Sequence, residues 1–304
     1  MKKKLIAVVG PTASGKTALS FALAEKIELE IVCMDSMQIY KRMDIGTAKP
    51  TQEERKRLAH HMLDIVEPSE NYSVAEYSKD SRLVIEDVLS RGKLPLLVGG
   101  TGLYLNALSM PFGFAGQPAD FKIRQKYEKF LLQNGNSALF EILKEKDELS
   151  AKRLHPNDTR RVIRALEVFE LTGKSISAQA ERVEGEYRIL PLAIDWDRQE
   201  LYQRINKRVD EMLELGLLSE LKALKNEGLT SDMQSMQGIG YKELLEHFEG
   251  KMSLDEALEL IKQRTRNYAK RQLTWFRRDE RLVWLRPDRA ESRAKEIAQK
   301  FLEE

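Results

Sequence analysis

Short apolar runs alternate with amphipathic segments in the first hundred residues of the chain. The runs Leu5–Val9, Glu30–Met34 and Leu94–Val98 have the length and character of buried strands. Between them, Ala18–Lys26 and Ser73–Arg91 carry apolar residues near helical spacing, and Gly92 follows directly where the second helix should end. This alternation predicts a parallel sheet with helices on both faces and ligands at the carboxyl ends of its strands.

The pattern changes after residue 109. Met110–Pro118 is rich in Gly and Pro, which is typical of a connector. From roughly Asp120 to Ala180 the chain is highly charged and helical in pattern, without a strand signal. Tyr187–Ile194 returns to strand character, and after Asp195 the pattern is helical almost to the end. We therefore expect a helical segment inserted between two parts of one α/β core.

The most informative motif follows the first apolar run. Residues 10–17 fit G-x-x-x-x-G-K-[ST], the loop that surrounds phosphate oxygens with backbone N–H groups, and they have the required strand before and helix after them. Glycines let the backbone turn its amides inward, and a helix N-terminus attracts anions. Lys16 would add a positive charge, and the Thr17 hydroxyl would hold Mg²⁺. The expected phosphate-binding residues are Gly10, Pro11, Thr12, Ala13, Ser14, Gly15, Lys16 and Thr17.

Motif and pattern together predict the fold class. We expect a P-loop-containing parallel α/β sheet with helices on both faces, an all-helical insertion domain and a helical C-terminal part. The predicted core comprises residues 1–117 and 186–304, and the predicted insertion comprises residues 118–185.

Composition limits the kind of partner. The 304 residues include 50 Lys and Arg against 48 Asp and Glu, so any surface for nucleic acid must be local. The only cysteine, Cys33, lies in an apolar run, which favours a small buried side chain over a nucleophile and excludes a disulfide within the chain. This cysteine usage suits a reducing cytoplasm.

The basic start of the chain superficially resembles a secretion signal. The apolar residues behind Lys2–Lys4 stop at Gly10, short of the roughly 7–15 that a signal requires, and we interpret them as the first strand. No run approaches the roughly 18 apolar residues of a membrane span. We expect a cytoplasmic protein without a membrane segment.

Asp35 is the best candidate for a general base. It ends a predicted strand that we expect to be adjacent to the strand carrying the phosphate loop, and carboxylates at such strand ends commonly act on the ligand. The alternatives are a link to Mg²⁺ or a cap for the next helix. The later strand ends in Gly99–Gly102 rather than in an Asp that would hold Mg²⁺, which disfavours a motor or switch ATPase without excluding a small kinase.

Three clusters of basic residues are candidates for contact with an anionic ligand or partner. Lys262–Arg286 interleaves nine Lys and Arg with Tyr268, Trp275, Phe276 and Trp284, which fits either an RNA-binding face or a helix with a buried aromatic side. Arg160, Arg161 and Arg164 fall in the first turns of a predicted helix, where cations oppose the helix dipole and suggest an anionic partner. Arg204 and Arg208 share a helix face, where they would clamp a diphosphate or pair with carboxylates.

A metal site at His60 and His61 is not favoured. Adjacent residues point to opposite faces of a strand, and no further ligand has a suitable spacing. Gln237–Lys242 forms a glycine-hinged turn before a helix, which alone indicates no function.

Taken together, these segments resemble the tRNA dimethylallyltransferase family, whose members transfer an isopentenyl group to an adenine beside the anticodon. The resemblance runs nearly end to end, and its most specific part is Asp35–Pro50. One departure is Gly238, where the family pattern has alanine, and no zinc-binding extension is present. The motifs that carry the resemblance are Gly10–Thr17, Asp35–Tyr40, Met43–Pro50, His60–His61 with Asp64, Val98–Tyr104, Arg160–Glu167, Ile239–Tyr241 and Lys270–Arg277.

The resemblance implies a reaction and its groups. Dimethylallyl diphosphate would occupy the phosphate loop, and Asp35 would remove a proton from the adenine amine, a poor nucleophile whose lone pair is delocalised. Lys16 and a Thr17-held Mg²⁺, with Asp35 as a further candidate ligand, would absorb the charge of the departing pyrophosphate. Thr101 would contact the tRNA or the extruded adenine. Arg204 and Arg208 would bind the diphosphate. No obligatory protein partner is implied, and we expect a monomer.

The resemblance also implies an extended tRNA surface, which the helical insertion shares. Its expected residues are Asp35, Ser36, Met37, Gln38, Thr101, Arg124, Thr159, Arg160, Arg161, Val162, Ile163, Gln237, Gly238, Ile239, Gly240, Tyr241, Lys242, Lys270, Arg271, Gln272, Trp275 and Arg277.

Two other classes of function stay open from the sequence. A small-molecule kinase would use ATP in the same loop and turn it over. A non-catalytic RNA-binding protein would use the loop as a switch and would lose no chemistry on Asp35→Ala. Relatives that prenylate free adenine nucleotides share the core motifs, but the basic C-terminal helix and the insertion favour tRNA.

Overall fold

The computed structural model of the chain describes residues 2–109, 120–176 and 185–304 and divides into two compact units. Unit 1 comprises Met1–Ser109 and Glu186–Glu304, and unit 2 comprises Met110–Gly185. Each unit has a hydrophobic core of its own. The connector predicted at Met110–Pro118 lies outside the described residues, as does the end of the helical segment predicted to reach Ala180.

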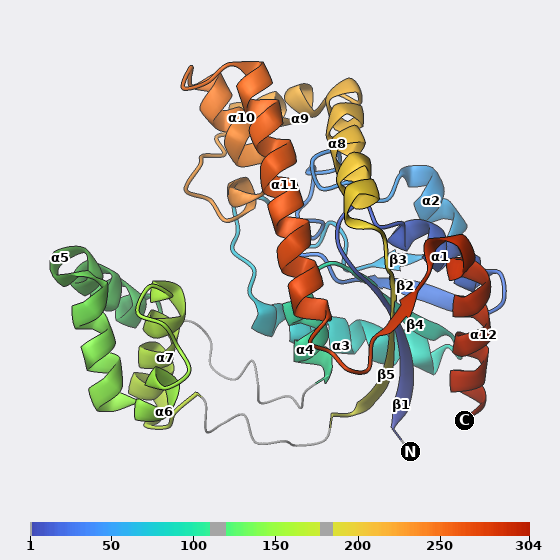
Figure 1. Cartoon of the computed structure of the whole chain (residues 1–304), viewed down its shortest axis with the longest axis horizontal. Coiled ribbons are helices and arrows are strands. Elements are labelled where there is room, and N and C mark those ends of the chain that lie inside the picture. Colours follow the sequence, from blue (N-terminus) through green and yellow to red (C-terminus); the bar gives the residue numbers. More distant parts are fainter. Residues whose placement is uncertain (1, 110–119, 177–184) are drawn as a thin grey trace. The chain divides into compact units, whose positions relative to one another are not determined.

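Unit 1 is built on a parallel sheet of six strands in the order β3-β2-β4-β1-β5-β6 (Figure 1). The strands predicted near the N-terminus, before Asp35, before Gly99 and after the insertion are all confirmed to within two residues. β6 was not predicted, because three residues are too short to show a period. The strands are β1 (Lys3–Val9), β2 (Leu29–Cys33), β3 (His60–His61), β4 (Leu94–Gly99), β5 (Tyr187–Ile194) and β6 (Val283–Leu285).

The strand before Asp35 is not adjacent to the strand before the P-loop, so this prediction was wrong. β4 lies between them and pairs with β2 on one side and with β1 on the other. The chain leaves β1 through α1 (Lys16–Ala24), skips one position to form β2, and returns through α3 (Val74–Ser90) to fill the gap. Right-handed crossovers permit either order, so the pattern of elements does not decide it. The glycine-rich end of β4 therefore separates Asp35 from the P-loop.

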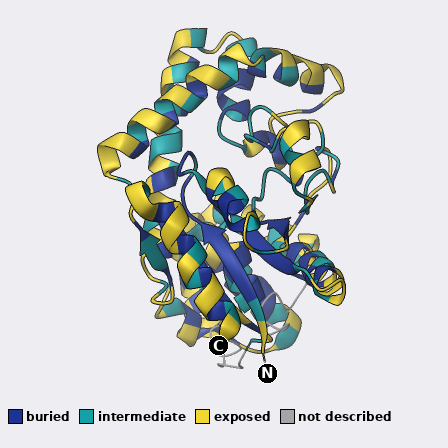
Figure 2. Cartoon of the chain, turned by 90° about the vertical axis from the view of Figure 1, so that its right-hand side faces the viewer, coloured by how far each residue is buried: buried dark blue, intermediate teal, exposed yellow. Residues whose placement is uncertain are grey.

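Helices cover both faces of the sheet, as predicted. α1 and α12 (Ala290–Glu303) pack on one face with Ile6 and Val8 of β1. α3 and α4 (Gly102–Ser109) pack on the other. Figure 2 shows the consequence, with buried strands between helices whose outer surfaces are exposed.

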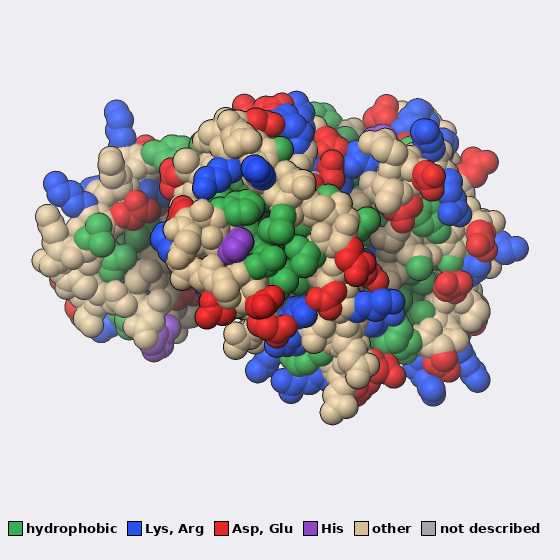
Figure 3. All heavy atoms as spheres, turned by 90° about the horizontal axis from the view of Figure 1, so that it is seen from above, with side chains coloured by type: hydrophobic (Ala, Val, Ile, Leu, Met, Phe, Trp, Pro, Cys, Tyr) green, Lys and Arg blue, Asp and Glu red, His purple; other side chains and the backbone are tan. Residues whose placement is uncertain are grey.

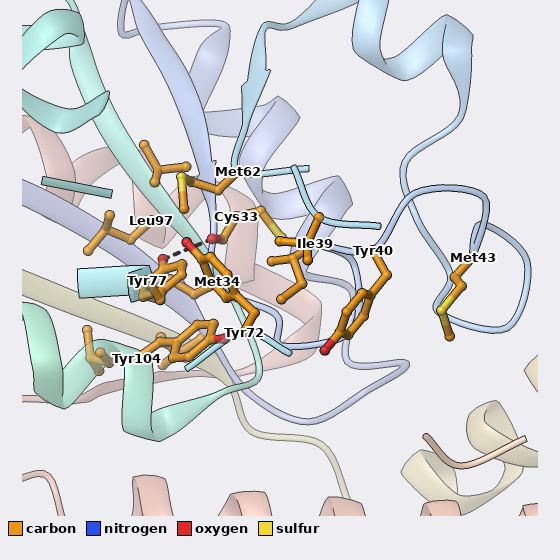
Figure 4. Close-up of a cluster of buried hydrophobic side chains, with 14 of the residues drawn as sticks. Cys33, Met34, Ile39, Tyr40, Met43, Met62, Tyr72, Tyr77, Leu97 and Tyr104 are labelled. Carbon is orange, nitrogen blue, oxygen red and sulfur yellow. Dashed lines mark hydrogen bonds between the residues drawn. The ribbon is translucent and has the colours of Figure 1, made fainter. Parts of the chain in front are cut away.

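The α3 face carries a cluster of tyrosines close to the end of β2 (Figure 4). Tyr77 and Tyr104 stack with ring centroids 3.6 Å apart and planes 8° from parallel. The Tyr77 hydroxyl donates a hydrogen bond of 2.9 Å to the carbonyl of Cys33. Burial raises the pKa of the Cys33 thiol, so this side chain is a neutral core group, as the sequence predicts.

The chain after β5 is mainly helical, as predicted, and α8 and α11 stand beyond the carboxyl ends of the strands (Figure 1). α11 begins with a capping box in which the Ser253 side chain accepts from the backbone N–H of Glu256. The remaining helices of unit 1 are α2 (Gln52–Arg57), α8 (Arg198–Glu214), α9 (Leu217–Asn226), α10 (Tyr241–Phe248) and α11 (Leu254–Phe276), with 3₁₀ turns at Ser235–Gln237 and Pro287–Arg289.

The secondary-structure elements of unit 2 within its described residues are all helices. They are α5 (Phe121–Lys146), α6 (Glu148–Ala151) and α7 (Thr159–Thr172). Gly135, with φ of 79°, interrupts α5 so that its two halves can pack on each other. This helical unit confirms the predicted character of the insertion.

Charges of both signs are interspersed on the face seen in Figure 3, around a patch of hydrophobic side chains. This mixture agrees with the formal net charge of +2. Among the described helices, none combines the length and the apolar character that crossing a bilayer requires.

Candidate active site at the carboxyl edge of the sheet

A cavity of about 700 Å³ lies where the carboxyl ends of the strands meet α8 and α11. Most of the residues of unit 1 that the sequence predicts to form the site line this cavity. Its walls include Thr12–Thr17, Asp35–Gln38, Gly46–Ala48, Arg204, Arg208, Gln237–Gly240, Tyr268, Arg271 and Gln272. The predicted residues of unit 1 that do not line it are Gly10, Pro11, Thr101, Tyr241, Lys242, Lys270, Trp275 and Arg277.

The P-loop adopts a conformation suited to an anion. Gly10, Ala13 and Gly15 have φ of 137°, 61° and 90°, which places three of its residues in the left-handed region. The carbonyl of Ala13 accepts from Arg204 Nε at 2.8 Å, and that of Ser14 accepts from Trp196 Nε1 at 2.9 Å. Because a trans peptide directs its N–H opposite to its carbonyl, the amides of the next residues point away from these donors.

The Ser14 hydroxyl is an unusual group in this loop. It is buried and forms no hydrogen bond within the described part of the chain. Buried hydroxyls without a partner are rare and disfavoured, and an oxyanion in the loop would satisfy this one. The residues present therefore fit a phosphate-containing ligand.

Lys16 supplies positive charge at the base of the cavity. Its Nζ donates to the carbonyls of Pro11 and Gly10 at 2.8 and 3.2 Å. Burial lowers the pKa of Lys16 to about 8, while the Asp35 carboxylate opposes this shift and Arg208 adds to it. The ammonium is thus mostly protonated at neutral pH but would lose its charge in mildly alkaline solution.

Arg204 and Arg208 bring two further cations to the same cavity. The Arg204 guanidinium lies 4.3 Å from the centre of the Trp196 ring, in a cation–π contact. Burial, and to a lesser extent Arg204, lowers the pKa of Arg208. The sequence leaves open whether these two arginines bind a diphosphate or pair with carboxylates. Within the described residues, neither side chain forms an ion pair with a carboxylate. Three cations thus converge on the P-loop.

Asp35 is held in a short turn after β2. Its Oδ1 accepts from the backbone N–H of Met37 at 2.9 Å, so one carboxylate oxygen is engaged by the turn. The adjacent end of β4 approaches closely, and a Cβ on Gly99 would lie 2.1 Å from the carbonyl oxygen of Met34. Only glycine at this position allows the two strand ends to meet in this way.

Thr101 links this turn to α11. Its hydroxyl accepts from the backbone N–H of Ser36 at 3.1 Å, and its side chain also interacts with that of Tyr268. Burial raises the pKa of Tyr268 to about 12, and the negative charge of Asp35 adds to the shift. Thr101 thus supports the Asp35 turn from outside the cavity lining. Sequence reasoning placed Tyr268 in an aromatic cluster but did not assign it to this site.

The loop that follows the Asp35 turn is fixed from two sides. Gln38 Nε2 donates to the carbonyls of Thr47 and Ala48, both at 3.0 Å. Glu220 of α9 accepts from the backbone N–H groups of residues 44, 45 and 46 at 2.8, 2.7 and 3.1 Å. Sequence reasoning missed Glu220, because an acidic residue in an ordinary amphipathic helix carries no signal of a contact so distant along the chain.

The C-terminal part of α11 has both a buried aromatic side and an exposed basic side, the two alternatives that the sequence leaves open for the basic cluster. Phe276 is buried in the core, and Trp275 packs over Gly102, where a Cβ would lie 2.3 Å from the indole. On the other side, Lys270, Arg277 and Arg278 form no ion pair within the described residues. A hollow of about 430 Å³ lies on this surface, lined by Asn267, Lys270, Arg271, Thr274, Trp275 and Arg278.

Two residues of unit 1 predicted to contact tRNA prove to have buried side chains. Gln272 is 6% exposed, and its amide bonds to two backbone groups. Tyr241 is 1% exposed and donates to Glu220 at 2.6 Å. The motif pattern does not distinguish such internal polar contacts from external ones. At Gly238, where the family pattern has alanine, a Cβ would lie 2.5 Å from Met37 Cε, so the glycine makes room for this side chain.

In unit 2, too, some of the residues predicted to contact tRNA are buried and others are exposed. Val162 and Ile163, which were predicted to contact tRNA, are buried in its core, because their side chains fall on the inner face of α7. Arg124 pairs with the buried carboxylate of Glu167 at 3.0 Å. By contrast, Arg160 and Arg161 are exposed beside Thr159, the first residue of α7. The exposed part of the predicted surface in this unit is thus the N-terminal turn of α7.

No group of three or more His, Cys, Asp or Glu side chains within the described residues is placed to hold a metal ion. His61 Nε2 lies 2.7 Å from Glu30, and His60 Nδ1 lies 2.7 Å from the carbonyl of Leu58. Each of these two histidine rings therefore has a hydrogen-bonding partner within the protein.

Comparison with known proteins places this site in a family. The family model described as IPP transferase matches residues 38–279. The chain belongs to this family. It is 48% identical to a tRNA dimethylallyltransferase from Carboxydothermus hydrogenoformans, across 100% of this chain and 98% of that protein.

Solved structures agree with the family assignment. A full-length tRNA isopentenylpyrophosphate transferase from Bacillus halodurans matches with a TM-score of 0.74 and 42% identity, over 99% of this chain and 97% of the other. A eukaryotic dimethylallyltransferase acting on tRNA matches with a TM-score of 0.85 and 33% identity, over 99% of this chain and 80% of the other. Both comparisons extend over almost the whole chain, including the P-loop that precedes the matched family region.

Proposed function

We propose that this enzyme transfers a dimethylallyl group from dimethylallyl diphosphate to the exocyclic amine of the adenine beside the anticodon in tRNA and releases pyrophosphate. The observation that carries the proposal is that the P-loop and Asp35 line one cavity. The full-length relatives named as tRNA prenyltransferases support the choice of donor and acceptor.

The leaving group is the reason for a P-loop in a transferase. Negative charge grows on the departing pyrophosphate as the bond to carbon breaks. The loop amides, the Ser14 hydroxyl and Lys16 would stabilise this charge, and the guanidinium groups of Arg204 and Arg208 would add to it from α8. These groups are fixed before the reaction, which is what makes such stabilisation effective.

The residues present also fit Mg²⁺. The ion commonly takes only one or two protein ligands and completes its shell with phosphate oxygens and water, so the absence of a cluster of carboxylates among the described residues is no obstacle. The Thr17 hydroxyl, exposed at the cavity, would hold it, with Asp35 as a further candidate. Bound there, Mg²⁺ would neutralise part of the pyrophosphate charge.

Asp35 would act on the acceptor. One oxygen is occupied by the Met37 N–H, which fixes the carboxylate and leaves the other oxygen to accept a proton from the adenine amine as the new N–C bond forms. The Thr101 hydroxyl holds the Ser36 N–H and thereby keeps the turn in place. The proton therefore moves to Asp35 while the electron pair of the breaking C–O bond leaves with pyrophosphate.

The adenine must leave its stack to reach this cavity, which costs a few kcal/mol and must be offset by contacts to the RNA backbone. We propose that Lys270, Arg277 and Arg278, at and just beyond the C-terminal end of α11, supply part of this offset and that Arg160 and Arg161 of unit 2 supply more. We further propose that the protein works as a monomer in the cytoplasm, where its single buried cysteine stays reduced.

One experiment separates this function from a kinase. Unmodified tRNA is incubated with the protein and dimethylallyl diphosphate labelled in its carbon chain, and in parallel with ATP labelled in its terminal phosphate. We expect label from the allylic donor in tRNA nucleosides and no phosphoryl transfer. Transfer of phosphate to a metabolite without prenylated nucleoside would contradict the proposal, and Asp35→Asn serves as the control for contaminating activity.

A further inference from the structure

Gln272 occupies an unusual position between three segments that are far apart in sequence. Its side chain extends from α11 and is 6% exposed. Nε2 donates to the carbonyl of Gly100 at 2.8 Å, and Oε1 accepts from the backbone N–H of Thr12 at 3.3 Å. One amide thus bridges the P-loop and the turn after β4.

The fit of this amide is close. A Cβ on Gly100 would lie 2.2 Å from Gln272 Nε2 and 3.2 Å from the carbonyl oxygen of Gly10. The Gln272 amide therefore occupies the space that any side chain at position 100 would need. A glycine at this point is what allows α11, the P-loop and the end of β4 to meet.

The chemistry of the contact requires an amide. One end must donate to a carbonyl while the other accepts from an N–H, and a glutamine side chain offers both at the required distance from the helix. A carboxylate would lack the donor, and an aliphatic chain would lack both groups. Leaving the backbone partners unpaired in a buried place is disfavoured.

The same face of α11 carries two other contacts with this turn. Tyr268, four residues before Gln272, interacts with Thr101, and Trp275, three residues after Gln272, packs over Gly102. Three successive positions on one helix face thus fix the segment that supports Asp35. Only the middle one also reaches the P-loop.

We propose that Gln272 is a positioning residue that sets the spacing between the diphosphate-binding loop and the turn that supports Asp35. This inference rests on the proposed function and adds a residue to it. Gln272 acts through the backbones of Thr12 and Gly100 rather than by contact with RNA. Its effect is on the geometry of the reacting groups, because a displacement of about 1 Å between such groups can slow a reaction by roughly a hundredfold.

The test compares Gln272→Leu with Gln263→Leu, the same change at an exposed position of the same helix. Three quantities are measured for each variant: the single-turnover rate at saturating tRNA and dimethylallyl diphosphate, the Kd of tRNA, and the Kd of inorganic pyrophosphate. For Gln272→Leu we expect a rate lowered by roughly ten- to a hundredfold, weaker pyrophosphate binding and a tRNA Kd within threefold of wild type. Gln263→Leu should match wild type in all three.

A second variant keeps the test decisive if Gln272→Leu does not fold. Gly100→Ala displaces the amide without changing it, and it should lower the rate and weaken pyrophosphate binding in the same way. Where both variants fold, a protein that carries both changes should react no more slowly than the slower of the two single variants, because both changes remove the same contact.

Two results would overturn the inference. The first is that Gln272→Leu and Gly100→Ala both have the same single-turnover rate and the same pyrophosphate Kd as Gln263→Leu. The other is a wild-type rate at saturation with a weakened tRNA Kd, which would make Gln272 an RNA contact. A wild-type protein that transfers no dimethylallyl group would contradict the proposed function alone, since pyrophosphate binding needs no transfer and still reports on Gln272.

Discussion

The Tyr241 hydroxyl donates a 2.6 Å hydrogen bond to Glu220, and the same carboxylate accepts three backbone N–H groups of the loop at residues 44–46. The ring of Tyr241 also covers Gly46, where a Cβ would lie 2.5 Å from it. The wall of the cavity formed by Gly46–Ala48 is therefore held by a carboxylate and a phenol that lie outside the cavity lining. Its shape depends on α9 and α10.

Glu220→Gln should loosen this loop. The variant keeps one acceptor oxygen but replaces the other by an N–H₂ that faces backbone donors. We expect a loss of about 1 kcal/mol in the free energy of unfolding, because three backbone donors, two of them partly buried, lose a charged acceptor. Urea unfolding measures the loss, and Glu214→Gln, an exposed change on α8, is the control. Equal stability of the two variants would show that the Glu220 contacts contribute little.

Asp35→Asn should abolish turnover while the protein still binds its substrates. An amide cannot accept the proton from the adenine amine, and general bases contribute about 10²–10⁴-fold to rate. We expect a single-turnover rate lowered by at least that factor and a tRNA Kd within tenfold of wild type. A rate near that of wild type would remove Asp35 as the base.

The charge of Lys16 should impose an alkaline limit on activity. Burial lowers the pKa of Lys16 to about 8, so the ammonium is protonated below this pH and loses its proton as the pH rises through it. We expect kcat/KM for dimethylallyl diphosphate, which reports on the free enzyme, to fall above about pH 8. Lys16→Met should have a low kcat/KM at every pH and should not show this alkaline fall. An unchanged kcat/KM of the wild type up to pH 9.5 would contradict the role of Lys16.

The cations at the C-terminal end of α11 and at its cap, Arg277, should contribute to the salt dependence of tRNA binding. Arg271→Ala or Arg277→Ala is expected to weaken binding and to reduce the slope of log K against log salt by about one each, if each cation neutralises one phosphate. Lys300→Ala, an exposed change on α12, should leave the slope unchanged. Slopes equal to that of Lys300→Ala would assign Arg271 and Arg277 a purely structural role.

The sheet and the P-loop could be predicted because their signals are local. The apolar run before Gly10 and the motif behind it specify a strand, a turn and a helix within about twenty residues. Tyr187–Ile194 is likewise apolar except for Arg188, and the strand has the same bounds in the structure. Such elements depend on their own residues more than on distant ones.

The remaining features depend on distant parts of the chain. Whether β4 or β2 pairs with β1 is decided by packing of the whole sheet, and both orders fit the same sequence pattern. Gln272 and Val162 belong to motifs rich in basic residues, yet their side chains turn inward. Position on a helix face decides this, and neighbouring residues of a motif fall on different faces.

The central claim is that the P-loop grips an allylic diphosphate while Asp35 deprotonates an extruded adenine. The most direct measurement is the yield of prenylated adenosine and of pyrophosphate in one reaction with unmodified tRNA, together with the position of the modified base in the RNA. We expect equal amounts of the two products and modification confined to the adenine beside the anticodon. Pyrophosphate or phosphate released without any prenylated adenosine would contradict it.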